Sequence, residues 1–283
     1  MPTLTTSDGR ALAYRLEGEG PLLLCHPGGP GFSAGYFGDL AGLRQRRTLV
    51  LLDPRGTGGS DPPADRRAYT TADYVADVEA LRTHLGLERI DLLGHSHGGV
   101  VAAAYAAAHP DRVARLILAS TLARFGPEQQ AAMDEGMTAK EHEPWYEDAR
   151  AALEAEQAGS FSSPAELTEL VLRELAFYFA HYGEAEKAWV EQLRDEVIDA
   201  DALRLFNEEI VLAFDLRPDL GRITAPTLVI TGAEDFITGA VCAGDFVAGI
   251  PGSELAILPS CGHIIFVEQP TAFRDAVVGF LDS

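Results

Sequence analysis

A serine stands between two histidines and two glycines in the segment Gly94-His95-Ser96-His97-Gly98. The segment follows an apolar run, Ile90 to Leu93, and opens an Ala-rich stretch, Val100 to Ala108. A serine on a sharp strand-to-helix turn has its hydroxyl held clear of the backbone, and small neighbours make room for that turn. The flanking pattern therefore predicts that Ser96 is a nucleophile, although Gly-x-Ser-x-Gly alone also fits a surface turn.

A serine hydroxyl becomes an effective nucleophile when a histidine takes its proton and a carboxylate orients that histidine. Asp235 follows the apolar run Thr227 to Thr231, and His263 follows the run Leu255 to Leu258. Both therefore fall where catalytic groups collect, at the carboxyl ends of parallel strands. This placement predicts Asp235 and His263 as the partners of Ser96.

Other interpretations of these positions stay open. Asp235 could instead cap the helix that follows it, and Glu234 is a weaker rival for the role of the acid. His263 could be a loop histidine without a chemical role. His95 and His97 flank the serine but are too near in sequence to reach it easily from the opposite side, so we expect both to line the site.

Acyl transfer also needs N–H donors for the oxygen that becomes negatively charged. One donor is expected to be the backbone N–H of His97, directly after the serine. The second is expected from the loop His26-Pro27-Gly28-Gly29-Pro30-Gly31, which follows the apolar run Leu22 to Cys25. Gly29 is the expected donor there, with an ordinary Gly/Pro turn as the alternative.

Strands and helices must position these groups. Short apolar runs alternate with helical patterns in both terminal parts of the chain, which predicts an α/β fold with a mostly parallel sheet and helices on both faces. The expected strands are Leu12–Leu16, Leu22–Cys25, Thr48–Leu52, Ile90–Leu93, Leu116–Ala119, Thr227–Thr231 and Leu255–Leu258. The expected helices are Tyr74–Leu85, Val100–Ala108, Ala240–Ile250 and Ala272–Leu281. The first two strands are expected to form an antiparallel start to the sheet.

The alternation stops at about Arg124 and resumes at Ile223. The segment between them has helix signals and no convincing strand. One clear helix start is Ser163-Pro164-Ala165-Glu166, with a serine cap and proline at the first helical position. We therefore expect a helical cap, residues 126–222, inserted into a catalytic domain of residues 1–125 and 223–283.

Glu174 lies within the apolar stripe of the helix that begins at Pro164, so it is expected to face the sheet domain. A buried carboxylate needs a partner, and a substrate ammonium could supply one. A structural ion pair is the alternative. Three side chains could provide that pair: Arg173, Arg204 and His181. Glu209 flanks a second apolar stripe and is a poorer candidate for binding substrate.

The charge of the chain is strongly negative. The 283 residues carry a net charge of −21, which argues against a nucleic-acid partner because phosphate binding needs a basic surface. Residues 127–215 hold 22 acidic and 6 basic side chains, a balance of −16. Acidic helix faces often serve solubility alone. The functional interpretation is a negative vestibule that attracts a cationic substrate group.

Several classes of protein are not expected. No run of about eighteen apolar residues occurs, so no membrane span is predicted. The polar start, Met1 to Arg10, has no secretory pattern, and a cytoplasmic location is the expectation. Cys25, Cys242 and Cys261 have spacings that fit neither a disulfide framework nor a zinc site. We expect no metal and no cofactor, and the oligomeric state stays open.

The chain resembles the α/β-hydrolases over residues 1–125 and 223–283, and within them it is similar to the proline iminopeptidase group. The loop Pro27-Gly28-Gly29-Pro30-Gly31 is similar to the His-Gly-Gly-Pro-Gly motif of that group. The segment Asp53 to Ser60 resembles its Asp-x-Arg-Gly-x-Gly-x-Ser motif. The sequence departs from the group at Pro27, where the group has histidine, and at His97, where tryptophan often follows the serine.

The resemblance implies a serine hydrolase with an acyl-enzyme intermediate, and an aminopeptidase that releases N-terminal proline or another small residue. In that group, cap carboxylates hold the free amino group of the substrate. The expected partner is a short-peptide or small-molecule substrate. A carboxylic ester, lactone or carbon–carbon bond hydrolase on the same triad is an alternative that the altered loop favours. A ligand-binding protein on a hydrolase scaffold is a further alternative, against which the complete serine, acid and histidine set argues.

Overall fold

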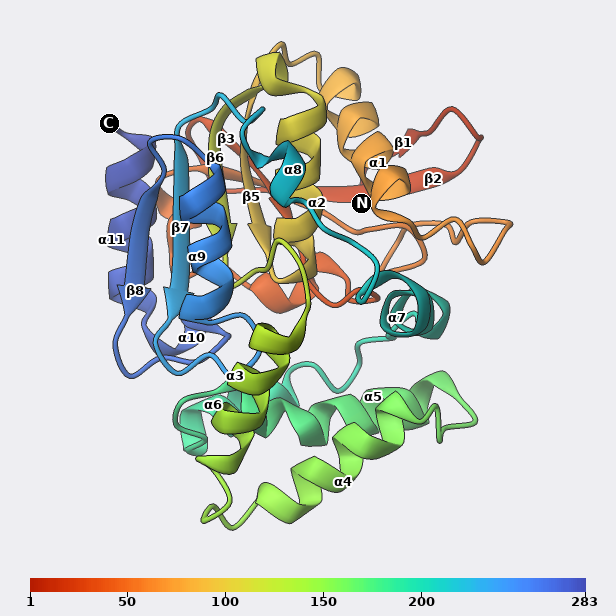
Figure 1. Cartoon of the computed structure of the whole chain (residues 1–283). Coiled ribbons are helices and arrows are strands. Elements are labelled where there is room, and N and C mark those ends of the chain that lie inside the picture. The colour runs from red at the N-terminus through yellow and green to blue at the C-terminus, as the bar shows by residue number, and fades with distance from the viewer.

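The structure is a computed structural model that describes residues 1–283, and its centre is one eight-stranded sheet (Figure 1). The strand order is β1-β2-β4-β3-β5-β6-β7-β8. The two N-terminal strands run antiparallel to their neighbours, and the other six run parallel to one another. The strands are β1 Thr3–Thr5, β2 Ala11–Glu17, β3 Leu22–His26, β4 Thr48–Leu52, β5 Ile90–His95, β6 Val113–Ala119, β7 Thr227–Gly232 and β8 Glu254–Leu258.

Helices cover both faces of the sheet (Figure 1). One face packs against α1 Thr71–His84, α2 His97–Ala108, α8 Arg217–Leu220 and α9 Ala240–Gly249. The other face packs against α10 Ile265–Glu268, α11 Pro270–Leu281 and the 3₁₀ turns η1 Ala34–Phe37 and η2 Leu43–Gln45. A third 3₁₀ turn, η3 Pro110–Arg112, links α2 to β6. This arrangement confirms the predicted α/β fold with a mostly parallel sheet.

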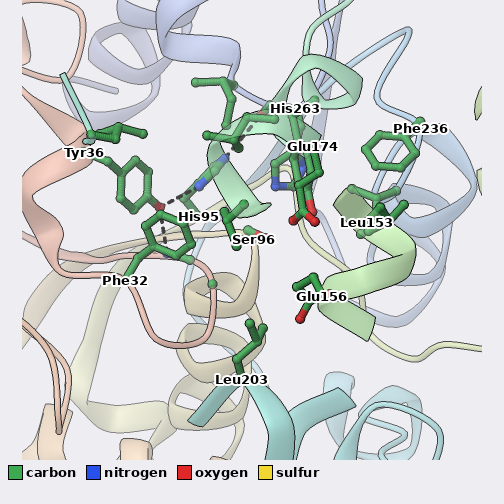
Figure 2. Close-up of a pocket in the computed structure, with 18 of the residues that line it drawn as sticks. Phe32, Tyr36, His95, Ser96, Leu153, Glu156, Glu174, Leu203, Phe236 and His263 are labelled. Atoms are coloured by element: carbon green, nitrogen blue, oxygen red, sulfur yellow. Dashed lines mark hydrogen bonds between the residues drawn. The ribbon is translucent and has the colours of Figure 1, made fainter. Parts of the chain in front are cut away.

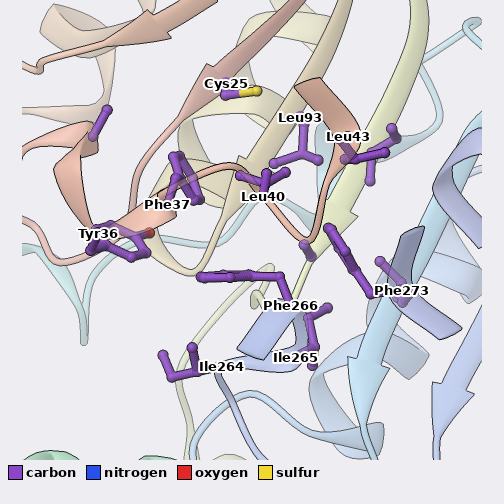
Figure 3. Close-up of a cluster of buried hydrophobic side chains, with 14 of the residues drawn as sticks. Cys25, Tyr36, Phe37, Leu40, Leu43, Leu93, Ile264, Ile265, Phe266 and Phe273 are labelled. Atoms are coloured by element: carbon purple, nitrogen blue, oxygen red, sulfur yellow. The ribbon is translucent and has the colours of Figure 1, made fainter. Parts of the chain in front are cut away.

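Two hydrophobic cores follow from the alternation of side chains along each strand. On β3, Leu23 and Cys25 point into the core shared with α11, whereas Leu24 between them points into the core shared with α1 and α2. Figure 3 shows the first core, where Phe266 and Phe273 lie close to the residues of η1 and η2. Because the central strands are buried on both faces, they appear in the sequence as continuous apolar runs.

The antiparallel start of the sheet differs from the expectation in its pairing. β2 pairs with β4, with Tyr14 opposite Leu52, and not with β3. The link between β2 and β3 passes over the turn that leads into β4, where a Cβ on Gly18 would lie 2.3 Å from the carbonyl oxygen of Arg44. The link therefore crosses the end of β4 instead of closing a hairpin. A first strand, β1, also precedes the strands that the sequence indicated.

The chain between β6 and β7 contains helices and no strand, and most of it lies beyond the carboxyl ends of the parallel strands (Figure 1). Its elements before α8 are α3 Pro127–Thr138, α4 Tyr146–Gln157, α5 Pro164–Glu174, the 3₁₀ turn η4 Leu175–Tyr178, α6 Glu184–Glu191, α7 Ala200–Leu205 and the π-helical turn η5 Phe206–Ile210. α8 packs against α2 and α9 beside the sheet, although the expected cap extends to residue 222. None of the helices is both long and apolar enough to cross a membrane.

Candidate active site

Ser96 lies on the turn from β5 into α2, in a strained backbone conformation. Its φ of 54° and ψ of −123° are uncommon for a residue with a side chain. The turn is too tight for side chains on its glycines, because a Cβ on Gly94 would lie 2.2 Å from the carbonyl oxygen of Gly98. A Cβ on Gly98 would lie 2.2 Å from the carbonyl oxygen of His26. The two glycines therefore permit the elbow that presents the hydroxyl of Ser96.

Asp235 and His263 meet beyond the carboxyl ends of β7 and β8. His263 Nδ1 lies 3.0 Å from Asp235 Oδ2, and both side chains are buried. The other carboxylate oxygen, Oδ1, accepts the backbone N–H groups of Ile237 at 3.1 Å and Thr238 at 2.9 Å. The hydroxyl of Thr238 donates to Oδ2 at 2.7 Å and lies 3.0 Å from His263 Nδ1. The carboxylate is thus held in place from several sides.

The acid is ionised. Burial raises the pKa of Asp235, but the His263 ring and the hydrogen bonds from Thr238 outweigh burial and lower the pKa to about 2. An ionised carboxylate accepts the Nδ1–H of His263, which leaves Nε2 of that ring as the proton acceptor. The rival acid, Glu234, is exposed and makes no hydrogen bond to His263.

The two histidines beside Ser96 have different surroundings. His95 lines the pocket, and its Nε2 lies 3.1 Å from the backbone carbonyl oxygen of His263. Since a carbonyl only accepts, Nε2 donates, and Nδ1 accepts the hydroxyl of Tyr36 at 2.8 Å. His97 is outside the pocket lining and packs edge-on against Tyr74 and Phe206. Burial lowers the pKa of both rings to about 3, so both are neutral.

The glycine-rich loop after β3 packs directly on the serine. A Cβ on Gly28 would lie 2.8 Å from Ser96 Cβ, and the N–H of Gly28 donates to the hydroxyl of Tyr36 at 2.6 Å. Gly29 follows with a φ of 108° and lines the pocket. The N–H of His97 belongs to the first turn of α2, where N–H groups have no carbonyl partner within the helix. His97 therefore offers an N–H directly after Ser96, and Gly29 lines the same pocket as Ser96.

A pocket of about 170 Å³ opens beside Ser96 and His263 (Figure 2). Hydrophobic residues make up 14 of its 23 lining residues, so most of the wall is apolar. From the catalytic domain the wall includes Phe32, Tyr36, Phe236 and Ile264. From the segment between β6 and β7 it includes Leu153, Val171, Leu175, Trp189, Leu193, Leu203 and Phe206. The pocket thus joins the two parts of the chain around the serine.

Two carboxyl groups interrupt this apolar wall. Glu174, at the end of α5, is 5% exposed, and its Oε2 has no hydrogen-bond partner. Glu156, on α4, is 7% exposed and accepts the side-chain amide of Asn207 at 3.2 Å. Burial raises the pKa of Glu156 to about 7, and burial together with the Glu156 charge raises the pKa of Glu174 well above its usual value. Figure 2 shows both side chains facing the space next to Ser96.

None of the three expected structural partners pairs with Glu174. Arg173 binds Asp148, with Nε 3.1 Å from Oδ2. Arg204 lies over the ring of Phe161 at 5.8 Å and near Glu208. His181 is exposed. The buried carboxyl of Glu174 therefore has no cationic partner within the protein.

Glu209 requires a correction, and Glu156 is a pocket residue that the sequence analysis missed. Glu209 is exposed and outside the pocket, whereas Phe206 and Asn207 of the same π-helical turn η5 line the pocket. Glu156 continues the spacing of the buried residues Tyr146, Ala149 and Leu153 on α4. Glu174 was predicted because it is an acidic residue within an apolar stripe. Glu156 shows the same pattern on α4, so the sequence could have predicted Glu156 as well.

Known proteins are similar to this chain along nearly its whole length. The family model described as alpha/beta hydrolase fold matches residues 21–270. The proline iminopeptidase of Lactobacillus helveticus (strain DPC 4571) is 31% identical, with 95% of this chain and 93% of that protein covered. The proline iminopeptidase of Levilactobacillus brevis is 30% identical, with coverage of 95% and 92%.

Solved structures of hydrolases are also similar to this chain along its whole length. A hydrolase from Pseudomonas aeruginosa PA01 is 33% identical with a TM-score of 0.72, and the comparison covers 100% of this chain and 98% of that one. The enol-lactonase from Burkholderia xenovorans LB400 is 27% identical with a TM-score of 0.76, and both chains are fully covered. The proline iminopeptidase of Mycobacterium smegmatis shares the fold at 24% identity, with a TM-score of 0.74 and coverage of 99% and 97%. The chain is a hydrolase of the α/β-hydrolase family, and it is similar to the proline iminopeptidases within that family.

Proposed function

We propose that the protein is a serine hydrolase with Ser96 as nucleophile, His263 as general base and Asp235 as the group that orients His263. Ser96 Oγ bonds to the substrate carbonyl carbon while His263 Nε2 takes its proton and passes it to the leaving amine or alkoxide. Water, activated by the same base, then releases the acyl group from Ser96. The N–H groups of Gly29 and His97 stabilise the oxyanion. The elbow and the Asp235–His263 hydrogen bond support these roles.

We further propose that the substrate is a short peptide or amide with a free N-terminal amine, from which proline or another small residue is released. The observation that carries this proposal is the pair of buried carboxyl groups, Glu174 and Glu156, in the apolar pocket that contains Ser96. Burying a carboxylate without a cation is costly, and a substrate ammonium supplies both charge and N–H donors. The helical segment 126–222 then acts as a cap that recognises the amine, and the proline iminopeptidase relatives support this reading.

A carboxylic ester or lactone is the second candidate substrate. The mostly apolar lining of the pocket favours it, because an uncharged ester or lactone needs few polar contacts. The similarity to the enol-lactonase from Burkholderia xenovorans LB400 points the same way. In this reading the two glutamates stay protonated and serve as hydrogen-bond donors to a substrate oxygen.

The substrate class is tested by measuring kcat/KM for three compounds: prolyl p-nitroanilide, its N-acetylated analogue and p-nitrophenyl butyrate. The proposal expects hydrolysis of the free-amine anilide and a loss of about 100-fold or more on acetylation, because acetylation removes the cation that pairs with the buried carboxyls. Turnover of the ester alone, or a preference for the acetylated anilide, would move the assignment to the esterase reading.

The catalytic assignment is tested separately with Ser96→Ala and His263→Ala. Both variants should lose turnover of every substrate, apart from a small residual rate from binding and the oxyanion donors. Ser96→Ala should also lose covalent labelling by a fluorophosphonate probe, whereas the exposed cap serine variant Ser160→Ala should label normally. Full labelling of Ser96→Ala would reject Ser96 as the nucleophile.

A further inference from the structure

The backbone of His263 is held on two sides, and one of the two contacts comes from the segment between β6 and β7. The N–H of His263 donates to the carbonyl oxygen of Tyr178 at 2.7 Å. Its own carbonyl oxygen accepts Nε2 of His95 at 3.1 Å. The ring of Tyr178 also packs edge-on against the imidazole, with 5.2 Å between the ring centroids. The position of the imidazole therefore depends on where residue 178 lies.

Glu268 joins the same two parts of the chain with one carboxylate. Its Oε2 accepts the N–H of Gly262, directly before His263, at 2.6 Å. Its Oε1 accepts the N–H groups of Ala180 at 2.8 Å and His181 at 3.3 Å. Three backbone N–H groups from the two segments thus donate to one carboxyl group, which links the segments directly.

The two segments touch closely enough to need a glycine. A Cβ on Gly262 would lie 2.6 Å from the carbonyl oxygen of Tyr178 and 2.7 Å from the N of Ala180. On the far side of Tyr178, the buried ammonium of Lys140 donates to the carbonyl oxygens of Phe177, at 3.1 Å, and Phe179. Residues 177–181, here called the strap, thus have their backbone groups bound by Lys140, His263 and Glu268 in turn.

We infer that Glu268 is a positioning residue for the base, which holds the strap against the loop of His263 and so places the imidazole at the correct distance from Ser96. The inference rests on the proposed role of His263. Catalytic groups must be held within about 0.5 Å of the productive geometry, and a misplacement of about 1 Å can cost about 100-fold in rate. The side-chain hydrogen bonds of Glu268 go to Gly262, Ala180 and His181, none of which lines the pocket, so its loss should act on the rate of reaction more than on substrate affinity.

The test is Glu268→Gln, which keeps the size of the side chain but leaves one acceptor oxygen, so that it cannot accept from both segments. We expect kcat to fall about tenfold or more while KM for the substrate changes less than about twofold, the pattern of a lost transition-state contribution. The matched control is Glu186→Gln. Glu186 also accepts a backbone N–H, that of Gly183 at 3.0 Å, but lies in α6 and makes no bond to the His263 loop. Its kcat should be unchanged.

A spectroscopic readout separates positioning from general stability. The low-field proton resonance of His263 Nδ1–H should shift or broaden in Glu268→Gln and stay in place in Glu186→Gln. Lys140→Met removes the other arm of the strap and should lower kcat in the same direction. If Glu268→Gln does not fold, the kcat of Lys140→Met takes its place in the test. Normal kcat in Glu268→Gln, or in Lys140→Met where only that variant folds, would overturn the inference. Full activity of His263→Ala would instead overturn the proposed function itself.

Discussion

The pair Glu174 and Glu156 should make the preference for a free amine depend on pH. The quantity to measure is the ratio of kcat/KM for prolyl p-nitroanilide to kcat/KM for its N-acetylated analogue. Changes in the efficiency of the catalytic residues themselves affect both substrates alike, so they cancel in this ratio. Under the proposed function, what remains is the contact between the substrate amine and the two carboxyl groups, which attract a cation only when ionised.

The size of the effect follows from the pKa of Glu156, which burial raises to about 7. With that value, about 3% of the Glu156 carboxyls are ionised at pH 5.5 and about three quarters at pH 7.5. An α-amino group titrates near pH 8, so most of the substrate is still cationic over this interval. The ratio should therefore rise about 20-fold between pH 5.5 and pH 7.5 and fall again once the substrate amine loses its proton. Because Glu174 interacts with Glu156, the midpoint belongs to the pair and not to one residue.

The assay is a p-nitroaniline release series across pH with both substrates. Glu156→Gln keeps the size of the side chain and leaves one titrating carboxyl, so its ratio should be smaller and should rise at a different pH. Glu154→Gln is the matched control, since Glu154 lies on α4 two residues away and faces solvent. A ratio that stays constant across pH in the parent enzyme would show that neither carboxyl contacts the amine.

Two further predictions concern Thr238, beside Asp235, and Glu174, in the pocket wall. Thr238→Val removes the hydroxyl that donates to Asp235 Oδ2 at 2.7 Å. A hydrogen bond to a charged group contributes about 1.5–3 kcal/mol, so kcat from steady-state kinetics should fall about 10- to 150-fold. Thr238→Ser should recover most of that loss, and normal kcat in the valine variant would refute the role of the hydroxyl. Glu174→Gln should be more stable to urea than the parent at about pH 8 and nearly equal at about pH 5, because the raised pKa of Glu174 means that the parent loses stability as pH rises above the value of an unfolded glutamate. An equal difference at both pH values would contradict the buried, unpaired state of this carboxyl.

The positions of Ser96, Asp235 and His263 could be predicted because each depends on local pattern. Glycines on both sides of Ser96 permit a turn that no other residue would, and the acid and the histidine each follow an apolar run. The parallel arrangement of the strands then brings these ends to one edge of the sheet. The order of the strands and the residues that follow them are therefore enough to predict that these three residues lie at one edge of the sheet.

Features that depend on contacts between distant segments could not be predicted. The pairing of β2 with β4 results from the link that passes over the turn before β4, and a link of four residues looked like a hairpin in the sequence. Glu209 lies beside an apolar stripe, and the structure places it on the solvent side of the turn η5 while Phe206 and Asn207 line the pocket. The local pattern was compatible with β2 pairing with either β3 or β4, and with Glu209 facing either the pocket or solvent. Contacts between distant segments decide between these arrangements.

The way the helical segment attaches to the catalytic domain bears on how substrate preference can change. The strap holds His263 through Tyr178, whose side chain also lines the pocket, so a substitution there that alters the pocket will also move the base. Glu156 is attached differently, because its one side-chain hydrogen bond is to Asn207 in the same helical segment. Substitutions at Glu156 can therefore change the pocket, and under the proposed function the amine that it accepts, without displacing His263. Variation in substrate preference at constant catalytic rate should accordingly concentrate on α4 and η5, away from the strap.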